Sequence, residues 1–251
     1  MIKFDVVPGV HALVHGYTNC YVIEGVGGIT LVDACYPSTW RMLETCLAQR
    51  SRSVQDIRGL IITHGHFDHV GFAARAQRSG IPVWAHRDDF PIVRHPYSYR
   101  PERPRLLYPL THPRAVPVLT AMVAAGALRV PGVTPDHELP AGPLAELPGQ
   151  PEIIHTPGHT AGECVVVLPD RSAVLTSDAL VTLDPYTGRR GPRIIAPAAT
   201  HDCQQALASL DALAALDADV VLTGHGIPWR HGIESAVRAA HANGIPRLGH
   251  K

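Results

Sequence analysis

Four side chains of the types that bind metals lie within six positions of one another, in the stretch IITHGHFDHVG (residues 61–71). They are His64, His66, Asp68 and His69, and an apolar run precedes them directly. A polar side chain costs free energy when it is buried without a partner. Three imidazoles and a carboxylate are ligands that a borderline divalent cation such as Zn²⁺ or Fe²⁺ prefers. The spacing H-x-H-x-D-H therefore predicts a metal site at the end of a buried strand.

Three further segments place a residue of the same kind at the end of an apolar, strand-like run. His159 lies in HTPGHTAGE, Asp178 in LTSDAL and His225 in LTGHGIP. Taken alone, each would serve as a capping or turn residue as readily as a metal ligand. Together with the first cluster, they predict four strand ends that converge on one metal centre.

The elements that must position these residues are predicted from the periodicity of the sequence. Short β-branched runs bounded by turn residues predict strands, and apolar residues at helical spacing behind Ser or Thr predict helices. The predicted strands cover residues 10–14, 19–24, 28–34, 57–64, 81–86, 152–156, 163–169, 172–180 and 218–224. The predicted helices cover residues 38–50, 70–80, 199–216 and 233–244. Two comparable halves of this kind favour two packed sheets with helices outside.

The order of the motifs THGHFDH, GHTAGE, SDAL and GHG resembles the metallo-β-lactamase superfamily over nearly the whole chain. The resemblance implies an α/β fold, a four-layer αββα sandwich, as a single domain over residues 1–251. It implies two divalent metal ions, with zinc expected first and iron or manganese as alternatives. The first ion would be held by His64, His66 and His159. The second would be held by Asp68, His69 and His225, with Asp178 bridging the two.

The amino-acid composition limits the classes of partner that we expect for this chain. The 251 residues include 22 basic and 22 acidic side chains, so the net charge of zero predicts neither a nucleic-acid nor an anionic membrane partner. No apolar run reaches the roughly 18 residues of a membrane span, and the N-terminus lacks the apolar segment of a signal peptide. The five cysteines form no CxxC pair, which favours reduced thiols and a cytoplasmic protein. Nothing in the pattern selects an oligomeric state.

The implied chemistry is hydrolysis of a small ester-like substrate, a thioester, lactone or carboxylic ester, by water activated between two metals. Asp68 would be a ligand and also the catalytic group that orients this water and carries its proton. An acidic residue at Asp178 resembles the glyoxalase II and lactonase branches, whereas true β-lactamases lack it. The 26 residues after His225 are too few for the glutathione-binding domain of glyoxalase II. The first aromatic residue after Asp178 is Tyr186, whereas in the lactonases a tyrosine follows the bridging aspartate more closely.

Three alternatives remain open at this point. A mononuclear-iron sulfur dioxygenase on the same fold would use His64, His159 and Asp178. A β-lactamase-like amide hydrolase would use the same centre on a different substrate. A protein that binds metal without catalysis is disfavoured, because a catalytic site needs the open coordination positions that a structural site lacks.

Residues 87–126 are rich in Pro, Arg, Tyr and His, and they predict either a lid over the centre or an ordinary surface excursion. We expect the part from Tyr97 to Tyr108 to cover the metal edge and to set substrate choice. Asp33, at the end of a predicted strand, is expected to hold a ligand loop in place. Two segments offer arginines to an anionic substrate group, and the alternative is that these arginines are ordinary solvated surface side chains. The residues are Arg100, Arg103, Arg105, Arg189, Arg190 and Arg193.

Overall fold

The first half of the chain forms a seven-stranded sheet in this computed structural model, which describes residues 1–105 and 108–246. The strands lie side by side in chain order, antiparallel from β1 to β4 and parallel from β4 to β7. Crossovers between the parallel strands carry the helices of the outer layer. The strands are β1 (Ile2–Val7), β2 (Val10–His15), β3 (Thr18–Gly25), β4 (Gly28–Val32), β5 (Ile57–Ile62), β6 (Val83–Ala85) and β7 (His137–Glu138).

The second half forms a five-stranded sheet in the order β14-β11-β10-β9-β8. Only the β11–β14 pair is parallel, so the carboxyl ends of these two strands meet at one edge. A separate hairpin, β12 (Val181–Leu183) with β13 (Arg190–Arg193), follows β11 in the chain. The strands of the five-stranded sheet are β8 (Gly142–Pro143), β9 (Glu152–His155), β10 (Cys164–Leu168), β11 (Ala173–Ser177) and β14 (Val220–Thr223).

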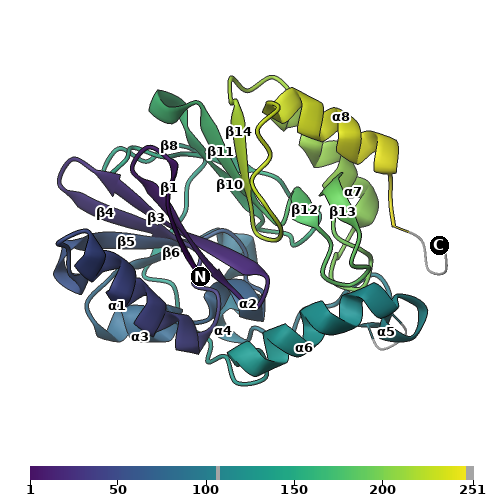
Figure 1. Cartoon of the computed structure of the whole chain (residues 1–251), viewed down its shortest axis with the longest axis horizontal. Helices are drawn as coiled ribbons and strands as arrows, with labels where there is room; N and C mark the ends of the chain where they lie inside the picture. Colours follow the sequence, from purple (N-terminus) through teal and green to yellow (C-terminus); the bar gives the residue numbers. More distant parts are fainter. Residues whose placement is uncertain (106–107, 247–251) are drawn as a thin grey trace.

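The two sheets pack face to face, and helices cover their outer faces (Figure 1). One apolar cluster lies between the sheets and includes Ile23, Ile61 and Leu175. Two more clusters join each sheet to its helices, around Leu43 in the first half and Val237 in the second. The fold is therefore the expected four-layer αββα sandwich. The outer helices are α1 (Trp40–Gln49) and α3 (Ala73–Arg78) on one side and α7 (Cys203–Ser209) and α8 (Ile233–Asn243) on the other.

Two of the predicted helices are shorter than their periodicity indicates. The helix expected over residues 70–80 is divided into α2 (Phe67–Val70) and α3, with Gly71 between them. A Cβ at Gly71 would overlap the backbone of Cys35, so the glycine permits the close approach at which the chain turns. The helix expected over residues 199–216 begins at Cys203, behind an Asp202 side chain that accepts from the amide of Gln205. It changes to a 3₁₀ turn over Leu210–Leu213.

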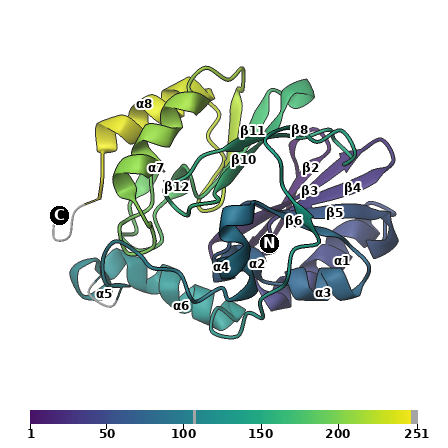
Figure 2. The ribbon, with the colours of Figure 1, turned by 180° about the vertical axis from the view of Figure 1, so that it is seen from behind.

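Residues 87–126 contain helices that the composition did not reveal. They are α4 (Phe90–Arg94), α5 (Tyr108–Thr111) and α6 (Val116–Ala125), and residues 106 and 107 of this segment lie outside the described part of the chain. Pro117 occupies the first turn of α6, where a missing N–H costs nothing. Figures 1 and 2 show α5 and α6 running along one end of the sandwich. Among the described residues, no helix has the length and apolar character needed to cross a membrane.

Candidate metal centre

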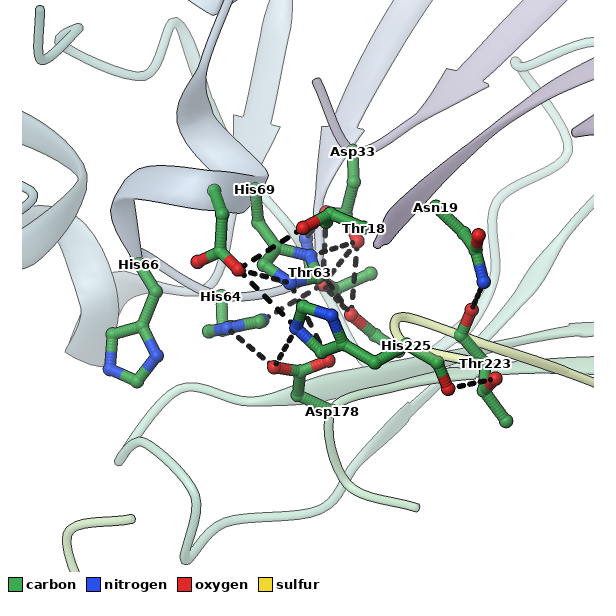
Figure 3. A network of polar contacts seen from close by, with 12 residues as sticks. Thr18, Asn19, Asp33, Thr63, His64, His66, His69, Asp178, Thr223 and His225 are labelled. Carbon is green, nitrogen blue, oxygen red and sulfur yellow. Dashed lines mark hydrogen bonds and ion pairs between the residues drawn. The ribbon is translucent and has the colours of Figure 1, made fainter. Parts of the chain in front are cut away.

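The predicted ligand residues come from strand ends that meet at one edge of the sandwich (Figure 3). His64 and His66 lie between β5 and α2, and the short helix α2 carries Asp68 and His69. The remaining three residues follow strands β9, β11 and β14 of the second sheet: His159, Asp178 and His225. Because β11 and β14 are parallel neighbours, the loops after them emerge side by side and face the turn after β5.

All seven side chains converge, and each is at most 5% exposed. They form three overlapping groups in which one ligand atom from each residue lies within 4.8 Å of the others. The groups are His64–His66–His159, His64–His69–Asp178 and Asp68–His69–His225. The structure thus brings together every residue that the sequence nominated, and the first and third groups match the two sets that the resemblance implies.

Asp178 lies at the centre of the cluster. Its Oδ2 atom is 3.3 Å from Nε2 of His225, 3.6 Å from Nε2 of His159 and 3.8 Å from Nε2 of His64. Its Oδ1 atom is 3.5 Å from Nε2 of His69. One carboxylate therefore faces imidazole nitrogens of both sets, which is the position a bridging ligand requires.

The outward nitrogens of the histidines are held by hydrogen bonds, and these bonds fix which nitrogen faces inward. The Thr200 hydroxyl donates to the carbonyl of Ile195, so it accepts the Nδ1–H of His159 at 3.1 Å. The Nδ1–H of His225 donates to the carbonyl of Tyr17 at 2.9 Å. In the neutral ring, both histidines therefore carry the Nε2 lone pair on the side that faces the centre, as metal-binding histidines generally do.

Asp33 and Thr63 perform the same task for the inward Nε2 atoms of His69 and His64. Nδ1 of His69 lies 2.8 Å from Oδ2 of Asp33, which therefore accepts its proton. Nδ1 of His64 lies 3.2 Å from both the Thr63 hydroxyl and Oε2 of Glu163. Because the Thr63 hydroxyl donates to Asp33, it is an acceptor for His64. The contact expected of Asp33 is present, and Asp33 reaches a ligand side chain directly.

Three inward-facing atoms are buried without a hydrogen-bond partner: Nε2 of His64, Nε2 of His69 and Oδ1 of Asp178. His66 instead presents Nδ1 to the cluster, 3.0 Å from Nε2 of His159. Buried polar atoms are rarely left unpaired, and each such atom costs about 1–3 kcal/mol. The donor set of imidazole nitrogen and carboxylate oxygen suits Zn²⁺, Fe²⁺ or Mn²⁺. The residues therefore fit a pair of divalent metal ions.

The charges of the two sets differ. Burial lowers the pKa of His64 and His66 well below the usual range, and burial lowers the pKa of His159 to about 4. Burial acts in the same direction on His225, but the carboxylates of Asp178 and Asp68 outweigh it and raise the pKa of His225 to about 10. Burial also lowers the pKa of His69, but Asp178, Asp33 and Asp68 outweigh it and raise this pKa well above the usual range. The first set is therefore neutral at pH 7, whereas both histidines of the second set stay protonated until cations displace their protons.

Asp33 and Ser177 are among the non-glycine residues near the centre that adopt left-handed backbone conformations. Asp33 has φ 62° and Ser177 has φ 45°. Their side chains meet, because the Ser177 hydroxyl donates to Asp33 at 3.0 Å. Thr63 bridges the same pair, with its Oγ1 atom 2.9 Å from Asp33 and 2.7 Å from Ser177. The loops after β4, β5 and β11 are therefore tied together directly behind His64 and His69.

Asp89 ties the His64–His66 loop to the His159 loop. Its buried carboxylate accepts from the amide of Gly65 at 2.8 Å, the hydroxyl of Thr160 at 2.7 Å and the amide of Gly162 at 2.7 Å. Burial raises the pKa of Asp89 to about 6 against the effect of these three donors. No sequence pattern indicated this role, because Asp89 is distant in the chain from both loops that it joins.

Side chains from two other segments cover the centre. The ring of Tyr99 lies on His66, with 3.8 Å between ring centroids, and the Arg105 guanidinium lies 3.9 Å above Tyr99. Met122 of α6 and Tyr186 line the small cavity over Asp68 and His225. An open pocket of about 220 Å³ reaches His66 and His159, with Tyr99 and Arg100 in its wall. Of the other arginines considered, Arg193 donates to the carbonyls of Gly191 and Arg190.

Sequence reasoning missed several of these contacts. Glu163 carried a signal, since a charged residue begins the otherwise apolar run ECVVVL, and it is fully buried. Thr200 and Tyr17 carried none, because one acts through a hydroxyl and the other through a backbone carbonyl. The glycine of TGHG also has a reason: a Cβ at Gly224 would overlap the carboxylate of Asp178.

Residues 13–225 match the family model described as the metallo-beta-lactamase superfamily. The chain is 28% identical over 235 residues to the probable metallo-hydrolase YflN of Bacillus subtilis (strain 168), covering 90% of this chain and 86% of YflN. The metallo-beta-lactamase family protein TTHA1429 from Thermus thermophilus has a similar structure, with a TM-score of 0.67 and 27% identity, over 95% of this chain and 80% of TTHA1429. The di-iron-bound form of TTHA1623 shares the fold, with a TM-score of 0.62 and 23% identity, over 89% of this chain and 95% of TTHA1623.

Proposed function

Because the chain belongs to the metallo-β-lactamase superfamily, whose members are largely metal-dependent hydrolases, we propose that it hydrolyses a small ester-like substrate at a dinuclear metal centre. The observation that carries the proposal is the set of inward-facing donor atoms. Three of them are buried and unpaired, and outer contacts direct Nε2 of His69, His159 and His225 inward. A purely structural polar cluster would pair these atoms with one another.

In this proposal, each ion is held by three residues of its own and by a shared carboxylate. His64, His66 and His159 hold the first, and Asp68, His69 and His225 hold the second, with Asp178 between them. Two divalent ions held by these residues would supply a water of lowered pKa and would polarise the oxygen of a substrate carbonyl. Zinc is the metal we propose. Iron is the alternative, because TTHA1623, which shares the fold, has a di-iron-bound form.

Asp68 is the residue we assign to proton transfer. It lines the cavity over the centre, and its Oδ2 atom is 3.3 Å from Nε2 of His225 and 3.4 Å from the Thr18 hydroxyl. The hydrogen bond from Thr18 and the neighbouring His225 keep the carboxylate oriented. From this position, Asp68 accepts the proton of the attacking water and passes it to the leaving oxygen or sulfur atom.

Water is the nucleophile in this scheme because the described residues offer no activated side chain in its place. All five cysteines are buried, and burial raises the pKa of Cys35 well above the usual range. Burial also raises the pKa of Cys46, Cys164 and Cys203, so these thiols, like that of Cys35, are protonated at neutral pH and do not act as nucleophiles. The sequence has no GxSxG motif that would present a serine.

We further propose that residues 87–126 form a lid that selects the substrate. The support is the position of Tyr99 on His66, together with Met122 in the wall of the small cavity. A pocket of about 220 Å³ favours a small acyl group over a large one. Arg100 in its wall and Arg105 on Tyr99 are the arginines placed to meet an anionic group. Tyr99→Ala should change the order of preference among acyl chain lengths.

The decisive experiment is a hydrolysis panel with zinc-loaded protein: a thioester, a lactone, an aryl ester, a phosphodiester and a β-lactam. We expect turnover of one or more of the first three, and its loss in Asp178→Ala. The iron-loaded protein is assayed in parallel for oxygen consumption with a persulfide. Oxygen uptake by the iron form, with no ester cleaved by either form, would replace the hydrolase by a sulfur dioxygenase. Preferred cleavage of the β-lactam would move the protein to the amide hydrolases.

A further inference from the structure

A second group of metal-binding side chains lies outside the seven-residue centre. His86 follows β6, Asp88 lies in the 3₁₀ turn Arg87–Asp89, and His155 ends β9. One ligand atom from each lies within 4.8 Å of the others. Because β6 belongs to the first sheet and β9 to the second, the group joins the two sheets at the surface. We call it the peripheral group.

The hydrogen bond of His155 prepares it as a ligand. Its Nε2 atom lies 2.8 Å from the carbonyl oxygen of Ala161, which can only accept, so the ring proton is on Nε2. The Nδ1 atom of His155 therefore carries the lone pair. A backbone carbonyl on the far nitrogen is one of the partners that metal-bound histidines usually have.

His86 and Asp88 present two electron-rich atoms to each other. Nδ1 of His86 accepts the amide N–H of Asp88 at 3.4 Å, so the lone pair of His86 points toward the Asp88 residue. Oδ2 of Asp88 lies 3.7 Å from this nitrogen, which is too far for a hydrogen bond. Two donor atoms on one zinc ion are about 3.4 Å apart, given bonds near 2.1 Å and tetrahedral angles. A small inward movement of Asp88 would give that separation.

The two imidazole rings are accessible enough to rearrange. They are stacked, with centroids 4.1 Å apart and planes 13° apart, so one ring must turn about its Cβ–Cγ bond before both lone pairs reach one ion. His86 is 17% exposed and Asp88 is 51% exposed at the side chain, so the pocket mouth leaves room for this rotation. Burial and the neighbouring His155 lower the pKa of His86, so its ring is neutral near pH 7 and Nδ1 can exchange the long bond from the Asp88 amide for a cation.

The peripheral group stands at the rim of the pocket that leads to the centre. Asp88 and Ala161 line the 220 Å³ pocket whose wall also includes His66 and His159. The adjacent residue, Asp89, is buried and holds the ligand loops from the inside. The two neighbouring carboxylates thus face different ways, one toward the centre and one toward solvent.

We propose that His86, Asp88 and His155 form an accessory site for one further divalent transition-metal ion, weaker than the centre and open to solvent. Two imidazoles and one carboxylate are a donor set that zinc accepts in proteins, and its remaining position would be filled by water. The site is weaker because one ring must leave its stack and because Asp88 is largely solvated. The proposal depends on these three residues alone and stands apart from the reaction at the centre.

Calorimetric titration with Zn²⁺ tests the proposal, using protein that has been loaded with zinc and freed of excess ions by gel filtration. We expect one additional ion per chain in the parent protein, bound more weakly than the ions that survive filtration. His155→Ala and Asp88→Asn should each weaken this step by at least about tenfold, because each removes one of three ligands. His95→Ala is the matched control, since it removes a nearby exposed imidazole outside the group.

Anomalous diffraction from zinc-soaked crystals supplies the second measurement. A peak among His86, Asp88 and His155 in the parent protein, absent in Asp88→Asn, supports the site. Asp88 is exposed, so this variant retains the fold, and its thermal unfolding provides the check. The proposal fails if the parent protein takes up no weakly bound ion, or if both variants retain the step unchanged. Because the central ligands are intact in every variant, either result leaves the proposed function untouched.

Discussion

The molecule holds two groups of histidine and aspartate with opposite surroundings. In the centre, every side chain is at most 5% exposed, and at least four imidazoles have their outward nitrogens held. In the peripheral group, only His155 is held by a carbonyl, and the two rings stack on each other. Residue types alone do not separate the two groups. The difference lies in the contacts behind the ligands.

This difference indicates what makes a tight site. The central histidines already have their lone pairs directed inward, so little rearrangement opposes binding. The peripheral histidines must break a stack and immobilise an exposed carboxylate, and both changes cost free energy. Preorganisation by outer contacts therefore sets affinity, and variants that alter those contacts should move the centre toward the behaviour of the peripheral group.

The largest effect is expected from Asp178→Ala. This change removes a carboxylate that faces both ligand sets and leaves four imidazoles without its charge. We expect elemental analysis of the purified variant to find neither central ion, with hydrolysis lost, while the peripheral step in the zinc titration persists. Retention of two tightly bound ions would show that Asp178 is not a bridge.

The next largest effect is expected from Asp68→Asn. General acid–base catalysis contributes roughly 100- to 10,000-fold, and we expect kcat to fall within that range at full metal loading. The asparagine has nearly the same size and still accepts from Thr18, so the fold is preserved. Metal content measured on the assayed sample separates loss of the proton acceptor from loss of the ion. Parent-like turnover by a fully loaded variant would remove Asp68 from the mechanism.

A smaller effect is expected from the residues behind the ligands. Asp33→Asn weakens the acceptor of His69 Nδ1 without changing the shape of the side chain. Outer contacts of this kind are worth about 10- to 100-fold in metal affinity, and competition with a chelator measures the change. Ser177→Ala, which removes only one donor to Asp33, is the graded control and should lose less. Equal affinities in all three proteins would mean that burial alone tightens the centre.

The smallest effect concerns pH. The pKa of His225 is raised to about 10, so the metal-free centre holds a proton at pH 7–9 that a cation must displace. The pKa of His69 is raised as well, so the affinity of the second ion should rise with pH in this window by up to about tenfold per unit for each proton released. The pKa of His86 is lowered, so the affinity of the peripheral site should be nearly constant there. Titrations in buffers of different ionisation enthalpy count the protons.

The ligands were predictable from the sequence because their signal is local. His64, Asp178 and His225 each follow an apolar strand in a turn that has no other reason to carry them. The strands of both sheets that hold these turns were visible for the same reason, as short apolar runs between turn residues. The ligand sets that the resemblance implied agree with two of the three groups in space.

The rest depended on contacts between distant segments. Strand β1 shows only a weak alternation of buried and exposed residues. Strand β12 follows the loop of Asp178 and pairs with β13 in a separate hairpin. Helix α6 was hidden because its apolar residues surround it, some of them buried against the first sheet and others exposed. Asp89 joins loops that lie about twenty and seventy residues away in the chain, a separation at which no periodicity operates.

The left-handed backbone at Asp33 and Ser177 bears on how this protein would respond to selection. For a residue with a Cβ, this conformation costs about 1–2 kcal/mol, and glycine would relieve it. Glycine at either position would also delete the carboxylate or hydroxyl that stands behind His69. At Asp33 this loss outweighs the relief, because the buried donors of Thr63, His69 and Ser177 would lose their acceptor at about 1–3 kcal/mol each. A library screened only for heat resistance should therefore retain Asp33, so selection for stability also preserves the contact behind His69.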